Sequence, residues 1–405
     1  MQLAVLGTGA MGFPMARRLC EAGHTVHAWN RSRDKAQRLA PFGAVVHANA
    51  AAAVREADIV VCMLESGPVI EDVLFRQGAA EAMRAGTLFI DMASIQPREA
   101  RDHAARLAAH RVQQLDAPVS GGTGGAENGT LAIMVGGKAA DFERAAPVLQ
   151  VLGRATHVGP SGAGELAKLA NQMIVGITIG AVAEALLLCQ KGGADMGKVK
   201  QAITGGFADS AILQEHGQRM VERDFAPRAR MTVVLNDMRN ALATAEEIGF
   251  DAPIAVMFEQ LYAQGVEHGL TDLDPAGLFV ELAKLANQMI VGITIGAVAE
   301  ALLLCQKGGA DMAKVREAIG GGFAESRILQ VHGQRMVERD FAPRARVSIQ
   351  LKDMRNALAT AEEVGFEAPV TALFEQLYAQ ADEHGLGDLD HAGLFVELAS
   401  RNGLR

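Results

Sequence analysis

One lysine and two amides stand together near the start of a long apolar segment of this sequence. Residues 165–196 show helical periodicity without strand alternation, and Lys168, Asn171 and Gln172 occupy positions i, i+3 and i+4. This spacing places the three side chains on one face of a helix. Polar groups on an otherwise apolar helix need polar partners or a cavity. The group therefore indicates either a site for a polar ligand or a lysine whose stem crosses apolar surface to reach water.

A glycine-rich loop near the N-terminus is suited to holding phosphate. Gly7, Gly9 and Gly12 form a G-x-G-x-x-G pattern that ends the apolar run at 3–7 and opens a helical segment. The first glycine allows a tight turn, the second lets backbone approach a pyrophosphate, and the third packs helix on strand. The N–H groups of the helix start can then bind the phosphates. The predicted dinucleotide site comprises Gly7, Gly9, Ala10, Met11 and Gly12.

The end of the second predicted strand, 24–30, indicates which dinucleotide binds. An NAD site usually has Asp or Glu there to accept hydrogen bonds from the ribose. This sequence has Asn30, Arg31 and Ser32. No carboxylate repels a 2′-phosphate, and the Arg31 guanidinium can pair with one. NADP(H) is therefore the preferred cofactor and NAD(H) a possible one, unless the arginines of this loop are only solvated charges.

A third candidate site lies in a glycine-rich turn. Ser120, Gly121 and Gly122 follow the predicted strand at 110–119, and the apolar stretch 129–137 resembles the second arm of a hairpin. The hydroxyl and the N–H groups of such a turn could hold a carboxylate. Ligands in open α/β folds bind at the carboxyl ends of strands, where this turn lies. The alternative is a hairpin connection without a ligand.

The elements that must position these residues are of two kinds. As far as residue 161, apolar strand-like runs alternate with helical segments, which predicts an α/β fold with a doubly wound parallel sheet of the Rossmann type. From 162 onward the pattern is helical and repeated, because 165–280 recurs at 281–396 with an offset of 116 (281 − 165). We predict a Rossmann domain and two all-α domains in tandem, with boundaries at 1–161, 162–280 and 281–405.

Composition excludes several classes of protein. The chain has 405 residues, 49% of them hydrophobic, and a net charge of −9, which argues against a nucleic-acid partner. The apolar run at 173–189 is interrupted by Glu184, so a buried helix is favoured over a membrane span. No signal peptide is recognised, and we expect a cytoplasmic protein. His216 and His332 are one repeated position, interpreted as surface histidines without a second ligand, so no metal site is predicted.

Three stretches together resemble a known family. "GTGAMGFPMARRL", "DAPVSGGTGGAENGTLAIMVGG" and "GAGELAKLANQ" are similar to the β-hydroxyacid dehydrogenases. That family includes the 3-hydroxyisobutyrate dehydrogenases and the tartronate semialdehyde (2-hydroxy-3-oxopropionate) reductases. "KLANQ" and "AITGGFADS" are most similar to the reductases. The resemblance runs from residue 1 to about 283 and implies NADPH-dependent reduction of a small carboxylate-bearing aldehyde to the hydroxy acid.

The resemblance also assigns roles to single residues. It implies that Lys168 is the general acid, and an ordinary lysine with a pKa near 10.4 is protonated at pH 7. It implies that Asn171 orients the substrate and that the turn at 120–122 binds the substrate carboxylate. On the cofactor side, it places Met63, Leu64 and Ser94 at the nicotinamide end. Glu65 stands where the family often has proline.

Other functions remain open at this level. A 3-hydroxyisobutyrate dehydrogenase, or a reductase of glyoxylate or succinic semialdehyde, would satisfy the same residues. A more distant alternative is a non-catalytic dinucleotide-binding module that associates through its helical domains. An imine reductase would usually carry Asp or Tyr at position 168, and a phosphogluconate dehydrogenase a histidine–asparagine pair on this helix.

The two copies differ at one position that matters to the resemblance. The family carries a cofactor-contacting lysine 68 residues after the catalytic one, and this place is Asn236 in the first copy but Lys352 in the second. We therefore include Lys352 among the candidate cofactor residues. Our hypothesis is that Lys168 serves catalysis and that Lys284 is an inherited passenger. The second copy could replace a partner subunit in an intrachain pseudo-dimer, the chain could form a homo-oligomer, or the doubling could be a recombination event without consequence.

Overall fold

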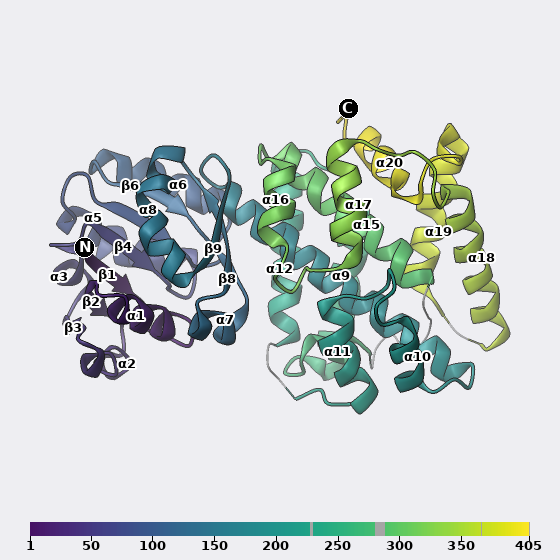
Figure 1. The fold of residues 1–405 in the computed structure, drawn as a ribbon, viewed down its shortest axis with the longest axis horizontal. Coiled ribbons are helices and arrows are strands. Elements are labelled where there is room, and N and C mark those ends of the chain that lie inside the picture. The colour runs from purple at the N-terminus through teal and green to yellow at the C-terminus, as the bar shows by residue number, and fades with distance from the viewer. Residues whose placement is uncertain (227–229, 280–287, 366, 405) are drawn as a thin grey trace. The chain divides into compact units, whose positions relative to one another are not determined.

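The computed structural model describes residues 1–226, 230–279, 288–365 and 367–404. The chain forms two compact units (Figure 1). The first contains Met1–Lys168 and Gly308–Gly322, and the second contains Leu169–Lys307 and Phe323–Arg405. The units do not follow the boundaries of the repeat. The start of the first copy as far as Lys168 and a short piece of the second copy belong to the N-terminal unit, and the other described residues of both copies belong to the second unit.

The N-terminal unit is built on a nine-stranded sheet with the order β3-β2-β1-β4-β5-β6-β8-β7 and with β9 paired to β8. The strands from β3 to β6 are parallel, β8 runs antiparallel to β6 and β7, and β9 is parallel to β8. The strand bounds are β1 Gln2–Leu6, β2 Thr25–Trp29, β3 Val45–Val46, β4 Ile59–Cys62, β5 Leu88–Asp91, β6 Gln113–Asp116, β7 Val119–Ser120, β8 Leu131–Gly136 and β9 Gly153–Gly159. The predicted Rossmann-type parallel sheet is confirmed.

Both faces of this sheet are covered, which explains its continuous apolar strands. On β1, Leu3 and Val5 belong to one hydrophobic core, whereas Ala4 and Leu6 belong to the core on the opposite face. The helices of this part of the chain are α1 Gly12–Glu21, α2 Arg33–Gln37, α3 Ala50–Val54, α4 Gly67–Glu71, α5 Ala79–Ala82, α6 Pro97–Ala109, α7 Gly122–Asn128 and α8 Ala139–Leu152. The predicted hairpin after Ser120 contains the short helix α7 between its two arms.

The rest of the described chain is helical. The first copy supplies α9 Ala163–Lys191, α10 Met196–Ile203, α11 Ala211–Glu222, α12 Met231–Glu247 and α13 Pro253–Gly265. The second copy supplies α15 Gln288–Lys307, α16 Met312–Ile319, α17 Arg327–Glu338, α18 Val347–Glu363, α19 Pro369–Ala381 and α20 Leu394–Arg401. The helices α9 and α15 are long and apolar enough to cross a membrane, but most of their apolar stretch is buried by neighbouring protein, as in core helices.

Matching residues of the two copies make matching contacts inside each copy. The Tyr262 hydroxyl donates to the carbonyl of Gly176 on α9 at 2.9 Å, and the Tyr378 hydroxyl donates to the carbonyl of Gly292 on α15 at 3.4 Å. Each pair is separated by 86 residues. Both tyrosines are fully buried, and their hydroxyls are therefore satisfied by the long helix of their own copy.

The copies also exchange contacts reciprocally within the second unit. Glu300 of α15 accepts the N–H groups of Ile254 at 3.1 Å and Ala255 at 2.9 Å at the start of α13. Its counterpart in the first copy, Glu184 of α9, accepts the N–H of Thr371 at 3.2 Å and its hydroxyl at 2.8 Å at the start of α19. Each long helix thus caps a helix of the other copy. This is the pattern of a two-fold, self-complementary interface.

A residue and its own repeat equivalent meet at the centre of this arrangement. Ser210 and Ser326, which are 116 positions apart (326 − 210), form an isolated antiparallel bridge. The neighbours form reciprocal backbone bonds, from Ala211 N–H to the Glu325 carbonyl at 3.1 Å and from Arg327 N–H to the Asp209 carbonyl at 3.3 Å. Self-pairing of equivalent positions is expected where a pseudo-two-fold axis passes between two copies.

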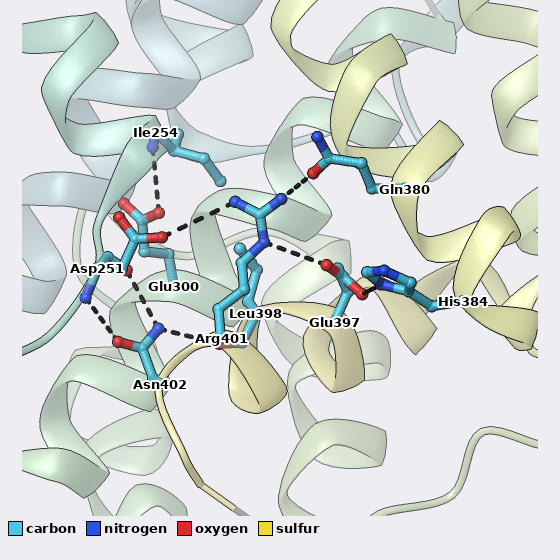
Figure 2. A network of polar contacts seen from close by, with 9 residues as sticks. All are labelled: Asp251, Ile254, Glu300, Gln380, His384, Glu397, Leu398, Arg401 and Asn402. Atoms are coloured by element: carbon cyan, nitrogen blue, oxygen red, sulfur yellow. Dashed lines mark hydrogen bonds and ion pairs between the residues drawn. The ribbon is translucent and has the colours of Figure 1, made fainter.

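The C-terminal helix adds a polar network to this interface (Figure 2). Asn402 follows α20 of the second copy, and its side chain accepts the Asp251 N–H at 2.6 Å and donates to the Asp251 carbonyl at 3.1 Å. Arg401 lies 3.8 Å from the same aspartate and donates to Glu397 at 3.1 Å. The segment before α13 of the first copy is therefore bound at both its backbone and its side chain.

Candidate active site

The glycine loop joins the carboxyl ends of three neighbouring strands. The N–H of Gly7, directly after β1, donates to the carbonyl of Trp29 at the end of β2 at 2.9 Å. Gly7 has φ +95°, and a Cβ there would collide with the carbonyl of Met63 after β4. A Cβ on Gly12 would collide with the carbonyl of Gly7. A Cβ on Gly9 would meet nothing within 4 Å, and this open space is where the fingerprint brings pyrophosphate against backbone.

A cavity of about 700 Å³ opens beside this loop. It brings together most of the residues predicted to bind cofactor, namely Gly7, Gly9, Ala10, Met11, Gly12, Asn30, Arg31, Ser32, Met63 and Leu64. Its size falls within the range of small-molecule sites, and its glycine-lined floor fits a dinucleotide. The residues present therefore suit the group that the fold implies.

The ribose end of this cavity carries more positive charge than the sequence pattern indicated. Asn30 ties the two loops together, because its Oδ1 accepts the Thr8 N–H at 3.0 Å. Arg31 and Lys35 both line the cavity, and Lys35 is a residue that sequence reasoning missed. Lys35 lies on α2, the short helix that follows the loop of Arg31, and a second basic residue so close in the sequence is the signal that could have found it. Glu65 lies 4.0 Å from Arg31, and both side chains are exposed, so this pair contributes little.

Three buried carboxyl groups gather at the carboxyl ends of β5 and β6. Asp116 at the end of β6 accepts the N–H groups of Gly162 at 2.8 Å and Glu165 at 3.1 Å. Glu165 in turn accepts the Ile95 N–H at 3.2 Å. Burial raises the pKa of Asp91 to about 7, although the Ala93 N–H opposes the rise. Burial also raises the pKa of Glu165 well above its ordinary range, with further contributions from Asp116 and Asp91.

This carboxyl cluster fixes the start of the helix that carries the lysine. Asp116 precedes Ser120 by four residues, and its hydrogen bonds hold the beginning of α9. Lys168 follows Glu165 by three residues on α9 and is half-buried, and its charge opposes in small part the rise that burial causes in the pKa of Glu165. Ser120 is buried, with 5% exposure. The N-terminal unit therefore contains both the predicted carboxylate turn and the predicted general acid, on two segments joined by Asp116.

The two amide side chains near the start of α9, Asn171 and Gln172, also have fixed positions. Gln172 accepts from the Asn171 amide at 2.8 Å and donates to Asp237 of α12 at 2.5 Å. Asn171 is completely buried, and its Oδ1 has no hydrogen-bond partner among the described residues. A buried acceptor without a donor costs about 1–3 kcal/mol. Asn171 is therefore suited to accepting a hydrogen bond from a ligand.

Two further residues of the sequence analysis are described by the structure, and a third is not. Ser94 is exposed in the loop after β5 and does not line the cavity. Lys352 lies on α18 in the second unit, with a side chain 64% exposed and its Nζ 3.3 Å from Asp353. Lys284 lies outside the described residues.

The prediction of a surface histidine is wrong for His332, and the His216 side chain is 12% exposed and lies 3.3 Å from Asp274. His332 is 3% exposed and lies 3.5 Å from Asp390, and its Nε2 lies 3.3 Å from the Nε2 of His391. The three side chains could reach one cation, because their ligand atoms lie within 4.8 Å of one another. However, the Arg335 guanidinium lies 2.9 Å from Asp390, and a cation there would repel it. His391 is separated from His332 by 59 residues, so only the fold could bring them together.

Comparison with known families divides the chain as the repeat does. Residues 2–159 match the family described as the NAD binding domain of 6-phosphogluconate dehydrogenase. The family described as NAD-binding of NADP-dependent 3-hydroxyisobutyrate dehydrogenase matches twice, at 162–282 and at 280–397.

Individual relatives agree with the family matches. The chain is 39% identical over 292 residues to 2-hydroxy-3-oxopropionate reductase of Escherichia coli, which covers 72% of this chain and all of that protein. It is 35% identical to 3-hydroxyisobutyrate dehydrogenase of Pseudomonas aeruginosa, covering 70% of this chain and 97% of that protein. Among solved structures, 3-hydroxyisobutyrate dehydrogenase of Mycobacterium tuberculosis with L-serine matches with a TM-score of 0.64 and 33% identity, covering 69% of this chain and 98% of that one.

Proposed function

The chain belongs to the β-hydroxyacid dehydrogenase family, and on that premise we propose that it reduces a small carboxylate-bearing aldehyde to the hydroxy acid with NADPH. The family assignment makes it an NAD(P)-dependent oxidoreductase acting on CH–OH groups. The proposed substrate is like that of 2-hydroxy-3-oxopropionate reductase. The observation that carries the proposal is the half-buried Lys168 in the same compact unit as the Ser120 turn and the glycine loop.

The residues of the chain divide the chemistry among them. The bound dinucleotide supplies the hydride that reduces the carbonyl carbon. Lys168 donates its proton to the carbonyl oxygen, so that the aldehyde becomes an alcohol and the neutral amine regains a proton from solvent. The Ser120 turn holds the substrate carboxylate through its hydroxyl and backbone N–H groups. Asn171, one helical turn from Lys168, orients the substrate through the amide oxygen that otherwise lacks a partner.

The preference for NADPH rests on the charges of the cofactor cavity. Arg31 and Lys35 line it together with the hydroxyl of Ser32, and no carboxylate ends β2. A 2′-phosphate accepts charge-assisted hydrogen bonds from such groups. Glu65 is the one acidic group ion-paired to Arg31 among the described residues, and its exposed position leaves the guanidinium available to a phosphate.

A substrate panel run with both cofactors tests this proposal. The purified chain is assayed with tartronate, methylmalonate and succinate semialdehydes and glyoxylate, each with NADPH and with NADH. We expect tartronate semialdehyde with NADPH to give the highest kcat/KM. The Arg31→Ala variant should lower kcat/KM for NADPH about tenfold and leave that for NADH nearly unchanged. Absence of reduction with every acid of the panel would refute the assignment.

A further inference from the structure

The same eight-residue helix occupies different surroundings in the two copies. In the second copy α16 packs against β8 and β9 of the sheet. There Val315, Ala318 and Ile319 have at most 1% exposure. In the first copy, α10 belongs to the helical unit and leaves the equivalent Val199 and Ile203 half-buried and Ala202 exposed. An apolar face that is covered in one copy is therefore open in the other.

Hydrogen bonds anchor α16 at both ends to the last strand of the sheet. The N–H of Asp311, which caps the start of α16, donates to the carbonyl of Val158 on β9 at 2.9 Å. At the other end the Arg154 guanidinium, also from β9, donates to the carbonyl of Gly320. Two bonds at opposite ends of an eight-residue helix fix both its position and its direction along the strand.

This anchoring brings the loop after α16 to the predicted carboxylate turn. A Cβ built on Gly322 would lie 3.0 Å from Ser120 Oγ and 3.4 Å from Ser120 Cβ. The equivalent residue of the first copy, Gly206, would meet only the carbonyl of Ile203, at 3.2 Å. Neither glycine has a positive φ, so alanine suits the backbone of both. The sequences around the two glycines differ only at Thr204 against Gly320 and Asp209 against Glu325 over 203–210 and 319–326, whereas their spatial neighbours differ.

From this arrangement we propose that the second copy completes the substrate site of its own chain, with Gly322 as a specificity-determining residue beside Ser120. This inference rests on the proposed function of the Ser120 turn. The first copy supplies Lys168 on α9, and the second supplies a wall that limits the room around the substrate carboxylate. Glycine is needed at 322 because any larger side chain would press on the Ser120 hydroxyl.

A cysteine pair tests the position of this wall without relying on activity. The Ser120→Cys/Gly322→Cys variant places two Cβ atoms at a separation close to the roughly 3.5–4.5 Å of disulfides. We expect it to form an intrachain disulfide on mild oxidation, whereas the matched Ser120→Cys/Gly206→Cys variant should not. The single variants control for the native thiols, of which Cys20 and Cys189 are half-buried. Failure of the first pair to oxidise, or a disulfide that joins two chains, would overturn the proposal.

Alanine at the same two glycines tests the role of the wall in specificity. Gly322→Ala should raise the KM for the semialdehyde about tenfold, with little change in the KM for NADPH or in Tm. Gly206→Ala should change none of these. In the Ser120→Ala background the effect of Gly322→Ala should shrink, because the methyl group no longer meets an oxygen. Equal semialdehyde KM values for the two alanine variants would refute the specificity role, and an inactive wild-type chain would instead refute the proposed function.

Discussion

The two helical copies share most of their sequence but differ in what surrounds them. Each long helix receives the same tyrosine hydrogen bond and caps a helix of the other copy. Yet α16 is buried against the sheet, while α10, whose apolar residues are nearly the same, is not. Local sequence determines the helices and their capping, but the place of a copy along the chain determines which surface it covers. The copies are therefore equivalent as folds and different as parts of the site.

Substitutions between the copies follow this division. The second copy has Gln350, Lys352 and His391 where the first has Val234, Asn236 and Pro275. Gln350 and His391 line a cavity of about 330 Å³ and form a polar contact, in which His391 Nδ1 lies 3.3 Å from Gln350 Oε1, whereas the Lys352 side chain is exposed. In the first copy the matching positions are apolar or uncharged. The two copies therefore differ in polarity at these three positions, although both form the same helices.

The largest expected effect separates the two lysines at equivalent positions. Lys168→Ala should lower kcat for semialdehyde reduction roughly 10²–10⁴-fold, because the proton donor is lost. Lys284→Ala should leave kcat within about twofold, because that lysine is not attached to a glycine loop. Steady-state kinetics of both variants, with Tm as the control for folding, make the comparison. Comparable losses from both substitutions would mean that the second lysine is not a passenger.

Glu184 and Glu300, which cap helices of the opposite copies, allow the two-fold interface to be tested by a substitution in each copy. Glu184→Ala and Glu300→Ala each leave buried donors of the other copy unsatisfied, and each should cost about 3 kcal/mol of unfolding free energy. Burial raises the pKa of Glu300 to about 8, so the isosteric Glu300→Gln, which stays neutral and keeps an acceptor oxygen for one of the two N–H groups, should cost less than alanine. Urea unfolding at pH 7 measures all three. A large loss from one alanine and none from the other would contradict a two-fold interface.

Much of this site could be predicted from sequence because local patterns encode it. The apolar run before Gly7 and the glycine spacing specify a strand, a turn and a helix, and the structure gathers these residues in one cavity. Likewise, the helical spacing of Lys168 and Asn171 was sufficient to place them on α9. Such inferences succeed because they depend on neighbours within a few positions of each other.

Other features depend on contacts between distant segments and gave no local signal. The strand β9 contains Arg154 and His157 and carries little apolar signal, and it is held by its pairing with β8 and by contacts with α16 of the second copy. No local pattern indicates that His332 is buried, because its partners Asp390 and His391 lie far along the chain, with His391 59 positions later. The exchange of α16 into the N-terminal unit could not be predicted at all, since α10 carries nearly the same sequence.

A smaller effect concerns the acid sensitivity of the second copy. Burial lowers the pKa of His391 to about 4, with a further contribution from His332, while Asp390 opposes the shift. Between pH 6.5 and 4 the unfolded chain therefore binds more protons than the folded one, and the unfolding free energy falls as the pH falls. In His391→Gln this slope should decrease by up to about 1.4 kcal/mol per pH unit. Urea unfolding across this range tests it, and identical slopes would contradict the shifted pKa.

The smallest expected effect decides which copy contributes to cofactor binding. Asn236 is next to Asp237, and Asp237 accepts a hydrogen bond from Gln172 of α9, the helix that also carries Lys168. Lys352 lies instead on α18, which packs against α15. Asn236→Lys should therefore lower the KM for NADPH about fivefold, equivalent to about 1 kcal/mol, because the resemblance to the family implies a cofactor-contacting lysine at this position. Lys352→Asn should leave that KM unchanged. The opposite result, a weaker affinity for NADPH only in Lys352→Asn, would assign the cofactor lysine to the second copy and reverse the division of roles argued above.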